Sequence, residues 1–223
     1  MNGVIGAILP LALGVAVSPI PVIAAILMLL SPRARSTGLG FLAGWILGIV
    51  VAVVVFTLLA ALIPPASSDD SNPVVGVVKI VLGLLLLVLA ARQWRSRPTP
   101  GETPPLPKWM AAIDDMTAVR ALAIGFLLSA VNPKNLLMAA GAGVEIGSAG
   151  LDGGETTIVI VVFVLLAAST VAVPVIGYLA ASARMTGPLE SMREWLVHNN
   201  ATVMAMLLLV IAIVMIGKGI GSF

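Results

Sequence analysis

One cation stands inside an apolar stretch of this sequence, and its neighbours are polar. Lys134 follows Asn132 and Pro133 and precedes Asn135, within AIGFLLSAVNPKNLLMAAGAG. A charge at the centre of a bilayer costs at least about 2.5–3.5 kcal/mol, so it is rarely kept there without a partner or a function. Asn is a favoured N-cap residue and Pro a favoured first helical residue. Asn132-Pro133 therefore predicts that a new helix starts inside this stretch.

A second polar interruption lies in the first apolar stretch, ALGVAVSPIPVIAAILMLL. Ser18-Pro19 has the same cap pattern as Asn132-Pro133, which predicts a second broken helix. Both new half-helices would turn their N–H groups and positive dipole ends toward a shared centre. With the Lys134 ammonium they predict a site for an anion such as a carboxylate, sulfate or phosphate. The predicted binding residues are Ser18, Pro19, Pro21, Asn132, Pro133, Lys134 and Asn135. For Ser18, a hydrogen bond to its own helix backbone is the alternative.

Lys79 lies within a separate apolar stretch, and Glu145 lies close to the end of the stretch that contains Lys134. With Lys134 they are the candidates for coupling transport to protons, which would make transport sensitive to a pH gradient. Lys79 could instead extend its side chain to the membrane surface, and Glu145 could mark the interface. A pair between Lys79 and Glu145 is a third alternative that spacing alone does not decide.

The composition is that of an integral membrane protein. Hydrophobic residues make up 60% of the 223 residues and charged residues 10%, against about 25% charged in soluble domains. A formal net charge of +2 gives no reason to expect a nucleic-acid partner. The chain has no cysteine and a single histidine, His198, so we expect no metal site and no cofactor. It shows no nucleophile–base pair and no phosphate-binding loop, so we do not expect an enzyme.

Six apolar segments are long enough to cross a hydrocarbon core, which needs roughly 20 residues per helix. They are residues 3–30, 38–63, 74–91, 119–143, 156–181 and 201–221. The first has no basic segment before it and exceeds a signal-peptide core in length, so we expect it to be retained as a span.

The charges between the segments predict the orientation. Nine of the twelve Lys and Arg residues lie in, or just after, alternate connections, whereas the intervening loops carry only acids. These nine residues are Arg33, Arg35, Arg92, Arg95, Arg97, Lys108, Arg120, Arg184 and Arg193. The basic side should be cytoplasmic. We therefore expect a multi-pass membrane protein with both termini outside.

Three spans in each half require the second half to be inverted relative to the first. The predicted organisation is an all-α fold of two inverted three-helix repeats, residues 1–91 and 119–223, with spans 1 and 4 interrupted at mid-membrane. Paired interrupted helices in corresponding positions indicate the central binding site of a transporter. Residues 92–118 form a cytoplasmic linker between the repeats.

The linker and the last connection each predict a short helix at the membrane surface. Five prolines in RPTPGETPPLPKW, residues 97–109, favour an extended segment. Trp109, Ile113 and Met116 follow at helical spacing, and residues 189–196 repeat the pattern before the last span.

A row of small residues marks the second span. Gly40, Gly44 and Gly48 recur every four residues and permit close helix approach. We expect packing inside one chain, with a homodimer as the alternative.

The stretch DDMTAVRALAIGFLLSAVNPKNLLMAAGAG, residues 114–143, resembles the signature region of a known family. This family is the lipid-addressing branch of the lysine-exporter (LysE) superfamily, with its sulfolipid- and glycopeptidolipid-addressing (GAP) membrane proteins. The Asn-Pro-Lys motif is shared across that superfamily, while Asn135-Leu136-Leu137 and the Pro-rich loop favour the branch. The resemblance extends over the whole chain through the six spans and Ser-Pro-x-Pro. It implies export, or help with export, of an envelope glycolipid across the bacterial inner (plasma) membrane, with Asn132–Asn135 and Ser18, Pro19 and Pro21 carried over as site residues.

Three functions remain open at this point. The first is a transporter that exports an anionic lipid or lipid precursor, with membrane lipids around it. The second is an exporter of an amino acid or other small anion, whose pocket would be closed off by polar groups instead of opening sideways to the bilayer. The third is a non-transporting partner of lipid-synthesis or export proteins, contacting them through residues 92–118. No nucleotide-binding motif is visible, so an ion gradient or another protein would drive transport.

Overall fold

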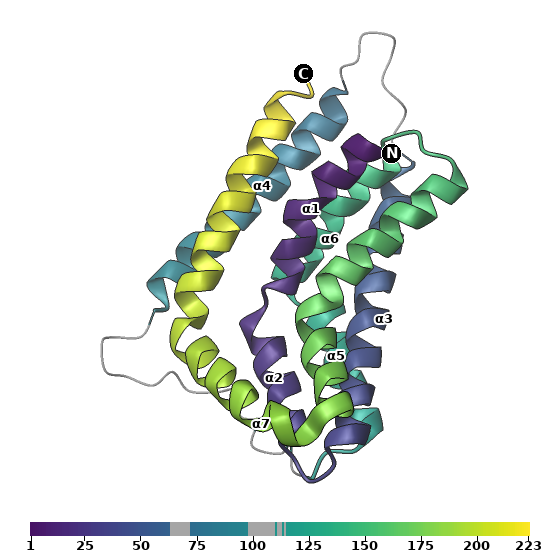
Figure 1. Ribbon diagram of the computed structural model, residues 1–223. Helices are drawn as coiled ribbons and strands as arrows, with labels where there is room; N and C mark the ends of the chain where they lie inside the picture. Colours follow the sequence, from purple (N-terminus) through teal and green to yellow (C-terminus); the bar gives the residue numbers. More distant parts are fainter. Residues whose placement is uncertain (63–71, 98–109, 111–112, 114) are drawn as a thin grey trace.

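The computed structural model describes residues 1–62, 72–97, 110, 113 and 115–223, and these residues form helices and no strands. The predicted all-α membrane class is confirmed at this level. The helices are α1 (Asn2–Ala16), α2 (Pro19–Leu29), α3 (Ala34–Ala60), α4 (Pro73–Arg95), α5 (Ala118–Ala130), α6 (Pro133–Gly147) and α7 (Gly153–Ile220). Figure 1 shows them as a bundle whose N- and C-termini lie at the same end.

Three helices, α3, α4 and α7, are each long and apolar enough to cross a membrane. Two further pairs qualify when each pair is counted as one bent span, α1 with α2 and α5 with α6. The described residues therefore contain three to five candidate membrane spans by length and composition.

Both predicted helix breaks occur at the predicted residues. α1 ends at Ala16 and α2 starts at Pro19, with a bend of 53° between them. α5 ends at Ala130 and α6 starts at Pro133, with a bend of 61°. Proline has no N–H for an intrahelical bond and its ring clashes with the preceding turn. At Pro19 and Pro133, which follow the N-cap residues Ser18 and Asn132, one helix ends and another begins, whereas Pro10, Pro174 and Pro188 lie inside helices.

The helix α7 contains two arms joined at a turn. Its 68 residues would span about 100 Å at 1.5 Å per residue if straight. The backbone at Ala181 is not helical, with φ −150° and ψ 57°. In Figure 1 the helix descends, turns at the lower end and returns to the C-terminus. The predicted surface helix at residues 189–196 belongs to this turn and return.

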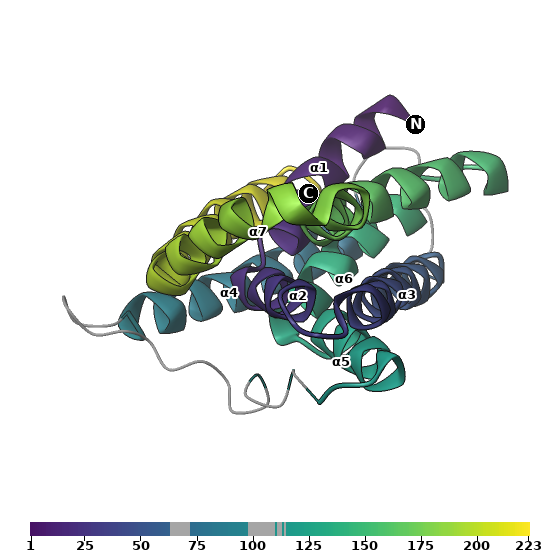
Figure 2. The ribbon, with the colours of Figure 1, turned by 60° about the horizontal axis from the view of Figure 1, so that its bottom comes forward.

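The basic residues of the helix ends gather at the end opposite the two termini. Arg33 caps α3, Arg120 lies in the first turn of α5, and Arg92 and Arg95 lie in the last turn of α4. In Figure 1 the starts of α3 and α5 lie near the α7 turn at the lower end, and the end of α4 lies further up at the left. Figure 2, which brings this lower end forward, shows the end of α4 apart from α3 and α5. We call the end opposite the two termini the basic end.

Parts of the predicted loops lie outside the described residues, including Asp69, Asp70, Lys108 and Trp109. Of the predicted surface helix after the Pro-rich segment, Ile113 and Met116 are described, and both are buried. Each is joined to a residue three positions earlier by a backbone hydrogen bond, so this part forms turns.

The glycine row of α3 lies directly against α5. A Cβ on any of the three glycines would overlap an atom of α5. The nearest atoms are Ala118 O for Gly40, Leu122 O for Gly44 and Ser129 Oγ for Gly48. This close approach holds the broken α5–α6 pair against the unbroken α3.

Candidate functional site

Lys134 joins the two helix breaks. It lies in the first turn of α6 with only 4% of its surface exposed. Its Nζ donates to Gly14 O at 2.5 Å and Ser18 Oγ at 2.5 Å, and more weakly to Val17 O at 3.4 Å. All three acceptors belong to the break between α1 and α2. A cation from one half of the chain therefore occupies the break in the other half.

The last carbonyls of α1 explain why a cation is stable there. The final turn of a helix leaves carbonyl oxygens without intrahelical donors and carries the negative end of the helix dipole. Besides the Lys134 ammonium, the hydroxyl of Thr170 in α7 donates to Ala16 O at 2.5 Å. Side chains from α6 and α7 thus satisfy the end of α1.

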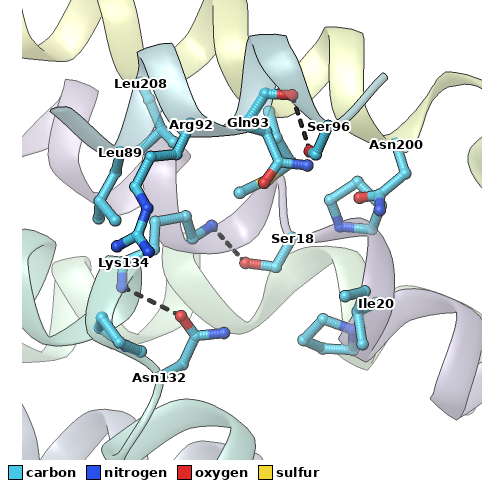
Figure 3. Close-up of a pocket in the computed structure, with 14 residues that line it drawn as sticks. Ser18, Ile20, Leu89, Arg92, Gln93, Ser96, Asn132, Lys134, Asn200 and Leu208 are labelled. Atoms are coloured by element: carbon cyan, nitrogen blue, oxygen red, sulfur yellow. Dashed lines mark hydrogen bonds between the residues drawn. The ribbon is translucent and has the colours of Figure 1, made fainter. Parts of the chain in front are cut away.

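The two asparagines stabilise the second break. Asn132 caps α6, because its Oδ1 accepts from the backbone N–H of Lys134 at 3.0 Å (Figure 3). Asn135 donates from Nδ2 to Leu128 O in the last turn of α5 at 3.0 Å. Its Oδ1 lies 3.4 Å from the hydroxyl of Ser18. The polar residues of the two breaks therefore form one connected network.

Ser18 occupies the N-cap position of α2 without capping it. Its hydroxyl donates to Val15 O at 2.6 Å and makes no cap bond. This is the backbone bond considered as the alternative for this serine. The same oxygen also accepts from Lys134, so the local bond and the role in the site coexist.

The two prolines of the first break limit what α2 can offer an anion. Pro19 and Pro21 have no N–H, and Val22 N donates to Ser18 O. Ile20 N–H is therefore the remaining donor of this helix start. The N-terminus of α2 is a weaker anion site than the pattern of two helix starts suggested, and more of the positive potential must come from side chains.

A cavity of about 420 Å³ opens at the two breaks. Its lining residues come from α2, α4, the start of α6 and the return arm of α7 (Figure 3). They are Ser18, Pro19, Ile20, Pro21, Leu89, Arg92, Gln93, Ser96, Asn132, Pro133, Lys134, Asn200, Met204 and Leu208. Six of the seven predicted binding residues line it, and Asn135 is buried behind it.

Four polar lining residues were not predicted: Arg92, Gln93, Ser96 and Asn200. The third apolar segment of the sequence ends near residue 91, whereas α4 continues to Arg95. Leu89, Arg92, Gln93 and Ser96 follow the spacing of one helical face. This spacing was the signal in the sequence that could have identified them. These residues extend the cavity from the breaks to the basic end.

The described lining contains two cations, Lys134 and Arg92, and no acidic residue. Lys134 is buried at the inner part of the cavity, and Arg92 is exposed at the basic end. The cavity can therefore bind an anionic group, with amide and hydroxyl side chains around it as neutral partners.

The other two candidate coupling residues lie in a separate ionic cluster. Glu145 Oε1 is 3.3 Å from the Nζ of Lys79 and 3.3 Å from the Nζ of Lys218. Lys218 also donates to Ala7 O at 3.3 Å. The side chains of Lys79 and Glu145 are each 11% exposed, so Lys79 is paired inside the protein. The cluster ties α1, α4, α6 and α7 together on the side of the termini, away from Lys134.

Comparison with known proteins agrees with the lipid-addressing part of the resemblance. No curated protein and no solved structure matches the chain significantly. The sequence model of one family, SfLAP, described as Sap, sulfolipid-1-addressing protein, matches residues 8–221. Because this match covers almost the whole chain, the protein belongs to the family of Sap, the sulfolipid-1-addressing proteins.

Proposed function

We propose that this protein exports an anionic envelope lipid, or a lipid precursor of the glycolipid type, across the bacterial plasma membrane. The substrate would bind in the cavity at the two helix breaks. The observation that carries the proposal is the buried Lys134, which lines this cavity and holds the end of α1.

The length of α7 supports six membrane crossings. A helix of 68 residues is more than three times as long as a crossing requires. Its two arms on either side of Ala181 add one crossing to the five counted from the other helices and pairs. Six crossings and two breaks fit two inverted repeats, an organisation that we propose together with a relation to the LysE superfamily.

The charge of the cavity supports an anionic substrate. An anion that reaches Lys134 must compete with Gly14 O, Ser18 Oγ and Val17 O for the ammonium hydrogens. The bond to Val17 O is the longest and the easiest to exchange. Substrate binding would thereby weaken the attachment of α6 to the first break, which gives a route from binding to movement of the broken helices.

The family and the cavity walls support a lipid over a small anion. The described lining combines Lys134 and Arg92 with apolar side chains from three helices, among them Ile20, Leu89 and Leu208. An amino-acid pocket should instead be closed off from the bilayer by polar groups. A lipid presents one charged end and one apolar end, which matches this mixture.

The two ends of the molecule differ in a way that fits transport. The cavity reaches the basic end, whereas the cluster around Glu145 holds helices together on the opposite side. We propose that this conformation is open to the cytoplasm. The ion pairs would separate when the opposite side opens.

The proposal is tested by replacing Lys134 with methionine, which removes the charge and keeps a similar length. The purified variant and the wild type are reconstituted into vesicles, and movement of an anionic lipid between leaflets is measured. We expect loss of lipid movement in the variant. Wild-type rates in a correctly folded Lys134→Met variant would contradict the proposal.

The control is Lys134→Arg, which keeps the positive charge. We expect it to retain part of the activity, because a guanidinium can still bind an anion although its shape differs. A deletion of residues 97–107 separates transport from a partner role. If lipid delivery in cells stops while vesicle transport persists, the linker recruits a partner in addition to the transport function.

A further inference from the structure

A second cavity, of about 380 Å³, lies on the other side of Ser18 and Pro19. It is formed by the end of α1, the start of α2 and both arms of α7. Ser18 and Pro19 also line the cavity of about 420 Å³ that contains Lys134 and Arg92, which we call the polar cavity. The two cavities therefore meet at the first helix break.

The second cavity has an apolar lining, whereas the lining of the first includes two cations. Its described lining includes no charged residue. Its three hydroxyl groups are already bonded to backbone carbonyls: Ser18 to Val15 O, Ser169 to Leu166 O and Thr170 to Ala16 O. Water in such a space would find few hydrogen-bond partners. Transfer of an apolar chain from water into it would be favourable.

One wall of the second cavity faces outward. Val173 lines the cavity and is 66% exposed. Ile176 and Leu165, on the same arm of α7, are also exposed apolar residues, as expected of a surface that faces lipid. An acyl chain could therefore enter from the bilayer without crossing a polar barrier.

We propose that the two cavities bind one amphiphilic molecule, with its anionic head group in the polar cavity and an acyl chain in the second cavity. The molecule would pass over Ser18-Pro19 between them. This inference rests on the proposed function and adds where the head group and the acyl chain of the anionic lipid bind. The α1–α2 break is then the point where head group and chain diverge.

The affinity of the protein for an anionic lipid should therefore depend on the length of the acyl chain of that lipid. Burial of each methylene group should raise affinity about fourfold until the second cavity is filled. The probes are glycerol 3-phosphate and its monoacyl derivatives with short chains of increasing length, which stay monomeric in water. Binding to the purified full-length protein in detergent is measured by titration calorimetry.

Val173→Trp fills the edge of the second cavity from a residue that is already exposed. We expect this variant to bind glycerol 3-phosphate like the wild type and to lose the gain with chain length. The matched control is Ile176→Trp, an equally exposed position on the same arm that does not line the cavity. Ile176→Trp should keep the gain. Met192→Trp fills the same cavity from the return arm of α7. It replaces Val173→Trp if the latter unfolds at a much lower temperature than the wild type.

Two results would overturn the two-cavity inference: no gain with chain length in the wild type, or an undiminished gain in both cavity-filling variants. A loss of the gain in Ile176→Trp would do the same, because it would indicate a general effect of tryptophan on this arm. Failure of the proposed function looks different. In that case Lys134→Met would bind glycerol 3-phosphate as the wild type does, whatever the chain-length data show.

Discussion

At the scale of single residues, Lys134 has a structural role, to which we propose that a binding role is added. Its ammonium can donate three hydrogen bonds, and Gly14 O, Val17 O and Ser18 Oγ accept them. A buried cation without such partners would be strongly unfavourable. The carbonyls at the end of α1 therefore explain how the charge is kept in an apolar region.

Arg92 is expected to contribute to anion affinity, and Arg95 is not. Arg92 lines the polar cavity, whereas Arg95, in the same last turn of α4, lines a different pocket. We expect Arg92→Gln to weaken binding of glycerol 3-phosphate several-fold, because one charge-assisted contact is lost near water. Titration calorimetry at two salt concentrations measures this loss, which should shrink at the higher one.

The control for this prediction is Arg95→Gln, which removes the same charge from the same last turn of α4. Its affinity should stay close to that of the wild type. Equal losses in the two variants would show that the arginines act through the general potential of the basic end. Arg92 would then have no specific place in the site.

At the scale of helices, close backbone approach sets the position of the broken pair. Gly44 of α3 leaves no room for a side chain against Leu122 O, whereas Gly6 of α1 has open space around it. We expect Gly44→Ala to destabilise the protein by about 1–3 kcal/mol through overpacking. Gly6→Ala should stabilise it by about 0.5–1 kcal/mol through helix propensity. Thermal unfolding in detergent measures both, and equal effects would contradict close α3–α5 packing.

The ionic cluster links four helices, so its loss should lower the stability of the protein. Glu145→Gln leaves Lys79 without a carboxylate in a site where its side chain is 11% exposed. We expect a loss on the order of 1–3 kcal/mol, below that of a fully buried pair because some water remains. The midpoint of thermal unfolding reports this loss.

Lys218→Met serves as the comparison for the cluster. Lys218 is 32% exposed, and its removal leaves the Lys79–Glu145 pair intact. We expect a smaller loss of stability than in Glu145→Gln. The reverse order would mean that Lys218 is the principal partner of the carboxylate.

At the scale of the whole molecule, the orientation can be tested without background labelling, because the chain has no cysteine. Ser36 lies near the start of α3 at the basic end, and Ala149 lies between α6 and α7, both exposed. In intact cells an impermeant maleimide should label Ala149→Cys. It should reach Ser36→Cys only after the membrane is opened. The opposite pattern would reverse the proposed orientation.

Local chemistry made part of this structure predictable. The two breaks were placed correctly, because Ser18-Pro19 and Asn132-Pro133 each join a favoured N-cap residue to a favoured first helical residue. Proline alone was not sufficient, since Pro10, Pro174 and Pro188 lie inside helices. The membrane class followed equally directly from hydropathy. The third apolar segment ends near residue 91, but α4 continues to Arg95, because a helix can extend beyond its apolar stretch.

The amino-acid sequence by itself determined the class of the protein, the two helix breaks and six of the residues that line the polar cavity. These depend on properties that each residue carries within its own segment. Only the tertiary structure decided that Lys134 binds the end of α1, that Glu145 joins Lys79 to Lys218, and that two cavities meet at Ser18. Such contacts join residues more than 60 positions apart, and they exist only once packing has brought the helices together.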